Sequence, residues 1–93
     1  MKFTTARLCG GKALMAISAD DLELYVLGAA ERFRAEGLPV SQADDMMAVF
    51  QWNGMEVTLY RQGKVMFMPL EDRALCIRYA TEILESLDAP KAA

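Results

Sequence analysis

The chain has 93 residues, of which 54% are hydrophobic and 25% are charged. This length is enough for one domain with its own hydrophobic core, and the composition excludes an intrinsically disordered chain. The formal net charge is −3 at pH 7, the opposite sign to that expected of a protein that holds nucleic-acid phosphates mainly by charge. No apolar run approaches the roughly 20 residues that span a bilayer.

The N-terminal residues do not form a convincing secretory signal. Arg7 and Lys12 interrupt the apolar stretch, and Ala13–Ile17 is shorter than the roughly 7–15 residues of a signal core. The two cysteines, Cys9 and Cys76, have no CxxC spacing and are predicted to be free thiols. We therefore expect a cytoplasmic protein with no membrane segment.

The N-terminal part of the chain is predicted to form a β-hairpin. Gly10-Gly11 is a two-residue turn signal that separates Phe3–Cys9 from Lys12–Ser18. A type I′ turn at these glycines pairs Leu8 with Ala13. The alternation of apolar and polar residues is weak in both segments, so the turn carries most of this prediction.

A first helix is predicted between Ser18 and Gly37. Ser18 can accept a hydrogen bond at the helix N-terminus, and Asp20-Asp21 places negative charge in the first turn, where the helix dipole favours it. Gly37 ends the helix and Pro39 prevents an immediate restart, so Leu38–Asp45 is predicted to be a loop. The apolar stripe at helical spacing consists of Leu22, Tyr25, Val26, Ala29, Ala30 and Phe33.

Two tight turns in the second half of the chain predict three antiparallel strands. Asn53-Gly54 is a strong hairpin signal because both positions of a type I′ turn need positive φ. Arg61-Gln62-Gly63 suits a three-residue loop with glycine at its third position. Together the two turns place Val57 between Phe50 and Phe67 on neighbouring strands.

This register sorts the side chains of the three strands into two faces. The face predicted to be covered by helices carries Ala48, Phe50, Trp52, Met55, Val57, Leu59, Val65 and Phe67. The opposite face carries Met47, Val49, Gln51, Glu56, Thr58, Tyr60, Lys64, Met66 and Met68. About half of that face is apolar, and contiguous apolar surface often marks an interaction site. The alternatives are ordinary scattered apolar residues, or an N-terminal segment that folds across the face.

A second helix is predicted after Pro69, opened by Glu71-Asp72. Its predicted apolar stripe is Cys76, Ile77, Ala80, Ile83, Leu84 and Leu87, and its predicted solvent side carries Arg78, Glu82 and Glu85. Residues 1–87 form one predicted domain, and residues 88–93 a flexible tail. The order β-β-α-β-β-β-α predicts an α+β two-layer sandwich, in which an antiparallel sheet of about five strands carries two helices on one face.

No cluster of residues predicts catalysis, a cofactor or a metal site. The chain contains no histidine, the commonest general base and metal ligand. Capping and solvation account for the acidic pairs Asp20-Asp21, Asp44-Asp45 and Glu71-Asp72. The segment Cys9–Lys12 lacks the spacing of a phosphate-binding loop, and its thiol has no histidine partner.

The pattern Tyr60-x-x-Gly63-Lys64-Val65-x-Phe67, followed by a helix, resembles TATA-box-binding-protein-like domains. Among such domains, it resembles the N-terminal substrate-binding domain of type III ribonuclease H. The wider pattern from Trp52–Gly54 to Tyr79-Ala80 is also similar to small stand-alone archaeal proteins of unknown function with a two-layer sandwich. The resemblance covers about the last half of the chain. It implies a sheet face that grips a nucleic-acid duplex or hybrid through Tyr60 and Lys64, with Arg61 beside them.

The residues favour a non-catalytic binding or self-association module that uses the sheet face opposite the helices. Its predicted contact residues are Met47, Val49, Thr58, Tyr60, Lys64, Met66 and Met68. The expected partner is a second copy of the chain or another protein, and no membrane. Nucleic-acid binding by the same face is the alternative. A third hypothesis, an enzyme that uses Cys9 or a carboxylate pair, has the least support.

Overall fold

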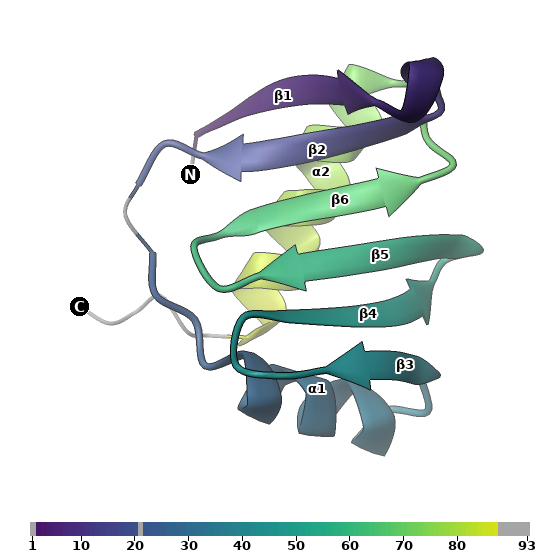
Figure 1. Ribbon diagram of the computed structural model, residues 1–93. Helices are drawn as coiled ribbons and strands as arrows, with labels where there is room; N and C mark the ends of the chain where they lie inside the picture. Colours follow the sequence, from purple (N-terminus) through teal and green to yellow (C-terminus); the bar gives the residue numbers. More distant parts are fainter. Residues whose placement is uncertain (1, 21, 88–93) are drawn as a thin grey trace.

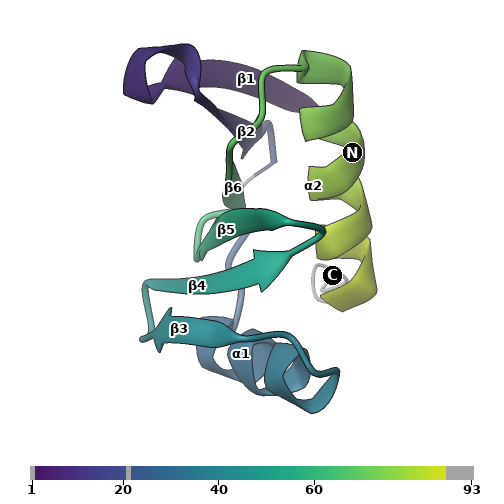
Figure 2. The ribbon, with the colours of Figure 1, turned by 90° about the vertical axis from the view of Figure 1, so that its right-hand side faces the viewer.

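The computed structural model describes residues 2–20 and 22–87, except for the side chain of Cys9. Its elements in chain order are β1 (Phe3–Leu8), β2 (Ala13–Ser18), α1 (Val26–Ala35), β3 (Val40–Ala43), β4 (Met47–Trp52), β5 (Met55–Tyr60), β6 (Lys64–Met68) and α2 (Arg73–Leu87). The strands form one antiparallel sheet in the order β1-β2-β6-β5-β4-β3 (Figure 1). Both helices lie on one side of this sheet (Figure 2), which confirms the predicted two-layer α+β sandwich.

The two turns of the second half fix the register that was predicted from them. Asn53 and Gly54 have φ of 54° and 78°, as a type I′ turn requires, and Gly63 closes the next turn with φ of 96°. Val57 on β5 pairs with Phe50 on β4 and with Phe67 on β6, and all three side chains are fully buried. The predicted core face of these strands is therefore confirmed.

The N-terminal hairpin forms with the predicted pairing of Leu8 and Ala13, but its strands are shorter than predicted. Cys9–Gly11 forms a short 3-10 turn, in which Gly10 and Gly11 have φ of 68° and 91°. The hairpin does not cross the sheet. Its second strand, β2, pairs with β6, so β1 and β2 extend the sheet sideways (Figure 1).

The first helix begins later than predicted, at Val26, and its N-cap Tyr25 makes no side-chain cap hydrogen bond. Ser18 does not cap it, because its hydroxyl accepts a hydrogen bond from the Asp20 amide at 3.1 Å in a local turn. Asp21 lies outside the described residues. Tyr25, predicted to be buried, is 76% exposed. The other residues of the predicted stripe that belong to the helix are buried: Val26, Ala29, Ala30 and Phe33.

Tertiary contacts explain why the residues before α1 are not helical. This segment runs past the turn between β5 and β6, where the Leu24 amide donates to the Arg61 carbonyl at 2.9 Å. The side chain of Leu22 lies against Gly63 in the same turn, and Leu24 is buried in the core. A helical conformation would withdraw these groups from the sheet, so packing overrides the local helix signals.

The predicted loop Leu38–Asp45 contains the sixth strand, β3, and this part of the prediction is wrong. Val40 pairs with Phe50 and Ala43 pairs with Ala48, with a register shift between Val40 and Gln42. The helix α1 ends at Ala35, shortly before Gly37, whose φ is 90°, and Pro39 then prevents a restart of the helix, as predicted. It does not prevent a strand from starting directly after it, because an edge strand tolerates proline at its beginning.

The core lies between the helices and the sheet, where aromatic rings join the two layers. The rings of Phe33 on α1 and Phe50 on β4 stack with centroids 4.2 Å apart. Tyr79 on α2 meets the ring of Trp52 edge-on at 5.1 Å. The predicted apolar stripe of α2 is largely confirmed, since Cys76, Ala80, Ile83 and Leu84 are buried, whereas Ile77 and Leu87 are half-buried. Residues 88–93, the predicted tail, lie outside the described residues.

Asp72 sets the start of α2, as predicted for the Glu71-Asp72 pair. Its carboxylate accepts a hydrogen bond from the Leu75 amide at 3.1 Å, and its carbonyl accepts one from the Cys76 amide at 3.0 Å. Neither helix of the described chain is long and apolar enough to cross a membrane.

Candidate functional site

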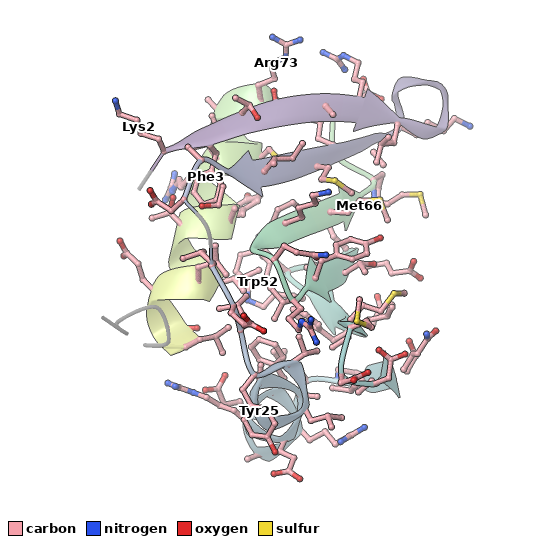
Figure 3. The ribbon with its side chains drawn as sticks, turned by 60° about the vertical axis from the view of Figure 1, so that its left-hand side comes forward. Lys2, Phe3, Tyr25, Trp52, Met66 and Arg73 are labelled. Carbon is pink, nitrogen blue, oxygen red and sulfur yellow. The ribbon has the colours of Figure 1, made fainter. Side chains whose placement is uncertain are left out.

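The seven predicted contact residues all lie on the side of the sheet that faces away from the helices. We refer to this side as the open face. Residues that pair across neighbouring antiparallel strands share a face, so the register defines its members. They are Thr4, Ala6, Leu8, Ala13, Met15, Ile17, Gln42, Met47, Val49, Gln51, Glu56, Thr58, Tyr60, Lys64, Met66 and Met68. Figure 3 shows Met66 projecting from this side, whereas Trp52 lies on the side of α2.

One row of paired residues crosses the open face from edge to edge. This central row consists of Ala6, Met15, Met66, Thr58, Val49 and Gln42, one residue from each strand. Thr58 lies in the middle and is only 3% exposed, although none of the described helices covers it. Its neighbours Val49 and Met66 are half-buried, so the side chains of the row pack closely together. Four of the six residues in the row are apolar. Methionine side chains adapt their shape to a partner, which suits a contact surface.

The N-terminal hairpin contributes residues that were not among the predicted contacts. Ala6 and Met15 extend the central row, and Ile17 pairs with Lys64 beside it. Leu14 and Ala16 are fully buried, whereas Met15 and Ile17 are half-buried, so β2 presents one side to the core and the other to the open face. The sequence contained no signal that this strand would pair with β6, and without that pairing the residues could not be assigned to the open face.

The open face carries one positive and one negative side chain, at opposite ends of the central strands. Lys64 begins β6, and Glu56 pairs with Met68 at the other end of that strand. Positions 64 and 68 are four residues apart along β6, which corresponds to a distance of about 13 Å. The central row passes between them, at Met66. The salt bridges of the described residues involve neither charge: Arg32–Glu36, Arg61–Glu23 and Arg78–Glu82.

Tyr60 lies at the Lys64 end of the open face, where it pairs with Met47. The nucleic-acid resemblance assigned contacts to Tyr60, Lys64 and Arg61. The first two share the open face, whereas the Arg61 guanidinium lies 3.8 Å from the Glu23 carboxylate in the turn beyond β5. The structure therefore brings two of these three residues to one surface.

The described residues hold no cluster of three or more His, Cys, Asp or Glu side chains that could bind a metal ion. Cys76 is a buried free thiol, and burial raises its pKa to about 11, so it stays protonated at neutral pH. Asp44 accepts hydrogen bonds from the amides of Met46 and Met47 at 2.8 and 2.9 Å, and these bonds lower the pKa of its carboxyl. Asp44 thus has a local structural role in the turn before β4.

Comparisons with protein families, with curated proteins and with solved structures found no match.

Proposed function

We propose that the protein is a non-catalytic module that associates through its open face, with a second copy of the chain as its partner. The observation that carries this proposal is the central row, a close-packed and mostly apolar strip that none of the described segments covers. Association removes such a strip from water, and this burial is the main driving force for most protein–protein contacts.

The size of the open face supports this role. Strands about 4.8 Å apart and about 17 Å long give a six-stranded face of roughly 450 Å² in projection. The accessible area of a corrugated face is larger than its projection. Two such faces in contact bury on the order of 1,000 Å², which is the lower limit for a specific interface. A two-fold dimer, the commonest assembly, uses the same surface of both copies.

The test replaces two residues of the central row by lysine. Val49→Lys/Met66→Lys places two charges on the central row, one on each side of Thr58. Each ammonium group would have to lose its water in an apolar contact. Neither side chain reaches the core, and lysine can extend its ammonium into solvent, so the fold should remain. We expect association, measured by sedimentation equilibrium, to be abolished at about 100 µM.

A matched control places the same charges on the helical side of the molecule. Tyr25→Lys/Leu27→Lys also replaces two apolar residues, which are 76% and 40% exposed and belong to the N-cap and first turn of α1. This variant should associate like the wild type. Equal association of the Val49→Lys/Met66→Lys variant and the wild type, with unchanged circular dichroism, would refute the proposal.

Nucleic-acid binding through the same face is the competing function, and the charge of the face gives it little support. Lys64 is the only cation among the residues of the open face, and Glu56 opposes it. Proteins that hold a duplex present several Lys and Arg side chains to the phosphates. Binding of a duplex or hybrid that weakens steeply with salt would favour this competing function instead.

A further inference from the structure

We propose a specific geometry for this contact, which rests on the proposed function. Two copies pack open face to open face around a two-fold axis that lies in the plane of the interface, along the central row and across the strands. The two charged ends of the face select this orientation. In this orientation, the Lys64 end of each copy faces the Glu56 end of the other copy.

A face-to-face dimer has two limiting orientations of its axis, along the strands or across them. With an axis along the strands, the Lys64 ends of both copies lie at the same end of the interface, and the Glu56 ends of both copies lie at the other end. This orientation would gather both Lys64 side chains at one end and both Glu56 side chains at the other. Like charges brought together in a contact with little water are strongly unfavourable, so this orientation is disfavoured.

An axis across the strands exchanges the two ends. Position 60 of one copy then lies over position 56 of the other on β5, and position 64 lies over position 68 on β6. Glu56 and Met68 are cross-strand partners, so the Lys64 ammonium of one copy reaches the Glu56 carboxylate of the other. The Tyr60 hydroxyl can donate to the same carboxylate. Each dimer contains this arrangement twice, once at each end.

The central row lies on the axis in this arrangement, so its residues meet their own counterparts. Met15, Met66 and Val49 supply apolar and adaptable contacts there. The strands of the two sheets run nearly antiparallel, within the roughly 30° offset that sheet twist imposes on aligned packing. Apolar contacts thus occupy the middle of the interface and charged contacts its two ends, as in typical interfaces.

The experiment is a charge exchange, measured by sedimentation equilibrium. In the dimer of the single variant Lys64→Glu, a carboxylate at position 64 of each copy faces Glu56 of the other copy. In the dimer of Glu56→Lys, an ammonium group at position 56 of each copy faces Lys64 of the other copy. We expect each single variant to raise the dimer Kd at least about tenfold. The double variant Lys64→Glu/Glu56→Lys restores opposite charges and should return the Kd to within about threefold of wild type.

A matched exchange on the other side of the molecule serves as the control. Arg78 and Glu82 form an exposed i,i+4 salt bridge on α2 at 3.5 Å. Reversing either charge, or both, should leave the Kd unchanged. The single-variant effects at the open face should also decrease as salt increases.

The outcomes separate this geometry from the proposed function itself. If the wild type does not associate, or if Val49→Lys/Met66→Lys associates normally, the proposed function fails. If the wild type associates and that variant does not, but the charge exchange fails to restore the Kd, the contact is real and the axis across the strands is wrong. The geometry is supported if both single variants raise the dimer Kd and the double variant Lys64→Glu/Glu56→Lys returns it to near the wild-type value.

Discussion

Gly63 lies in the turn between β5 and β6, where the side chain of Leu22 approaches its backbone closely. Its φ of 96° lies in the region that favours glycine, and a Cβ built on it would lie 2.8 Å from Cδ1 and 3.2 Å from Cβ of Leu22. The sequence indicated this glycine from the turn alone. The packing of Leu22 against it was not predictable, because Leu22 was assigned to a helix.

Replacing Gly63 by alanine should therefore destabilise the protein through both backbone strain and a steric clash. We expect a loss of about 2–4 kcal/mol in the free energy of unfolding, measured by urea denaturation. Gly54→Ala is the control, since its φ is 78° and no atom lies within 4 Å of the added Cβ. Its loss should be only about 1–2 kcal/mol. Equal losses in the two variants would show that Leu22 does not press on this turn.

Asp44 should make stability depend on pH in one direction. Hydrogen bonds from the Met47 and Met46 amides lower the pKa of the folded carboxyl from its ordinary value of 3.8. The ionised carboxylate therefore contributes its full stabilisation at pH values above 3.8. This contribution is lost as the pH falls through the lowered pKa. Asp44→Ala should melt below the wild type at neutral pH, and the difference in Tm should shrink as the pH falls below 3.8 and through the lowered pKa.

The control for this pH dependence is Asp44→Asn, which keeps an acceptor oxygen without a titrating group. Its difference in Tm from Asp44→Ala should not change over the acidic range in which the wild-type carboxyl titrates. A wild-type advantage over Asp44→Ala that persists unchanged at low pH would contradict the assigned role of the carboxylate.

At the scale of elements, local sequence signals predicted a helix or strand correctly where the interacting residues are close together in the chain. Asn53-Gly54 joins two adjacent strands that pair with each other, and Asp72 caps the helix that follows it directly. Ser18 has the same capping chemistry, but the residues after it are held against the β5–β6 turn. The start of α1 depends on that tertiary contact, which local sequence does not encode. The edge strand β3 was missed because its four residues lack a clear alternation.

The cap of α2 gives a prediction at this scale. Asp72→Ala removes the oxygen that accepts the hydrogen bond from the Leu75 amide and should reduce the free energy of unfolding by about 1 kcal/mol. Asp72→Asn keeps an acceptor and should lose less. Glu71→Ala, at the neighbouring exposed residue, should change stability by less than about 0.5 kcal/mol. Chemical denaturation of the three variants distinguishes capping from a general effect of acidic charge.

At the scale of the whole molecule, the two tight turns carried most of what could be predicted about the candidate site. They fixed the register of β4, β5 and β6, and all seven predicted contact residues share the open face as a result. The position of the β1–β2 hairpin was not predictable, because strand pairing between distant segments depends on the whole sheet. That pairing keeps the face uncovered by the described chain and adds Met15 and Ile17 to it.

The proposed function and the proposed geometry both require that the open face forms a contact between two copies of the chain. The most direct measurement is the solution mass of the wild-type protein by light scattering after size exclusion, at about 10 and about 100 µM. We predict a mass that rises with concentration towards twice the 10.3 kDa of one chain. A mass that stays at one chain at both concentrations would contradict the claim.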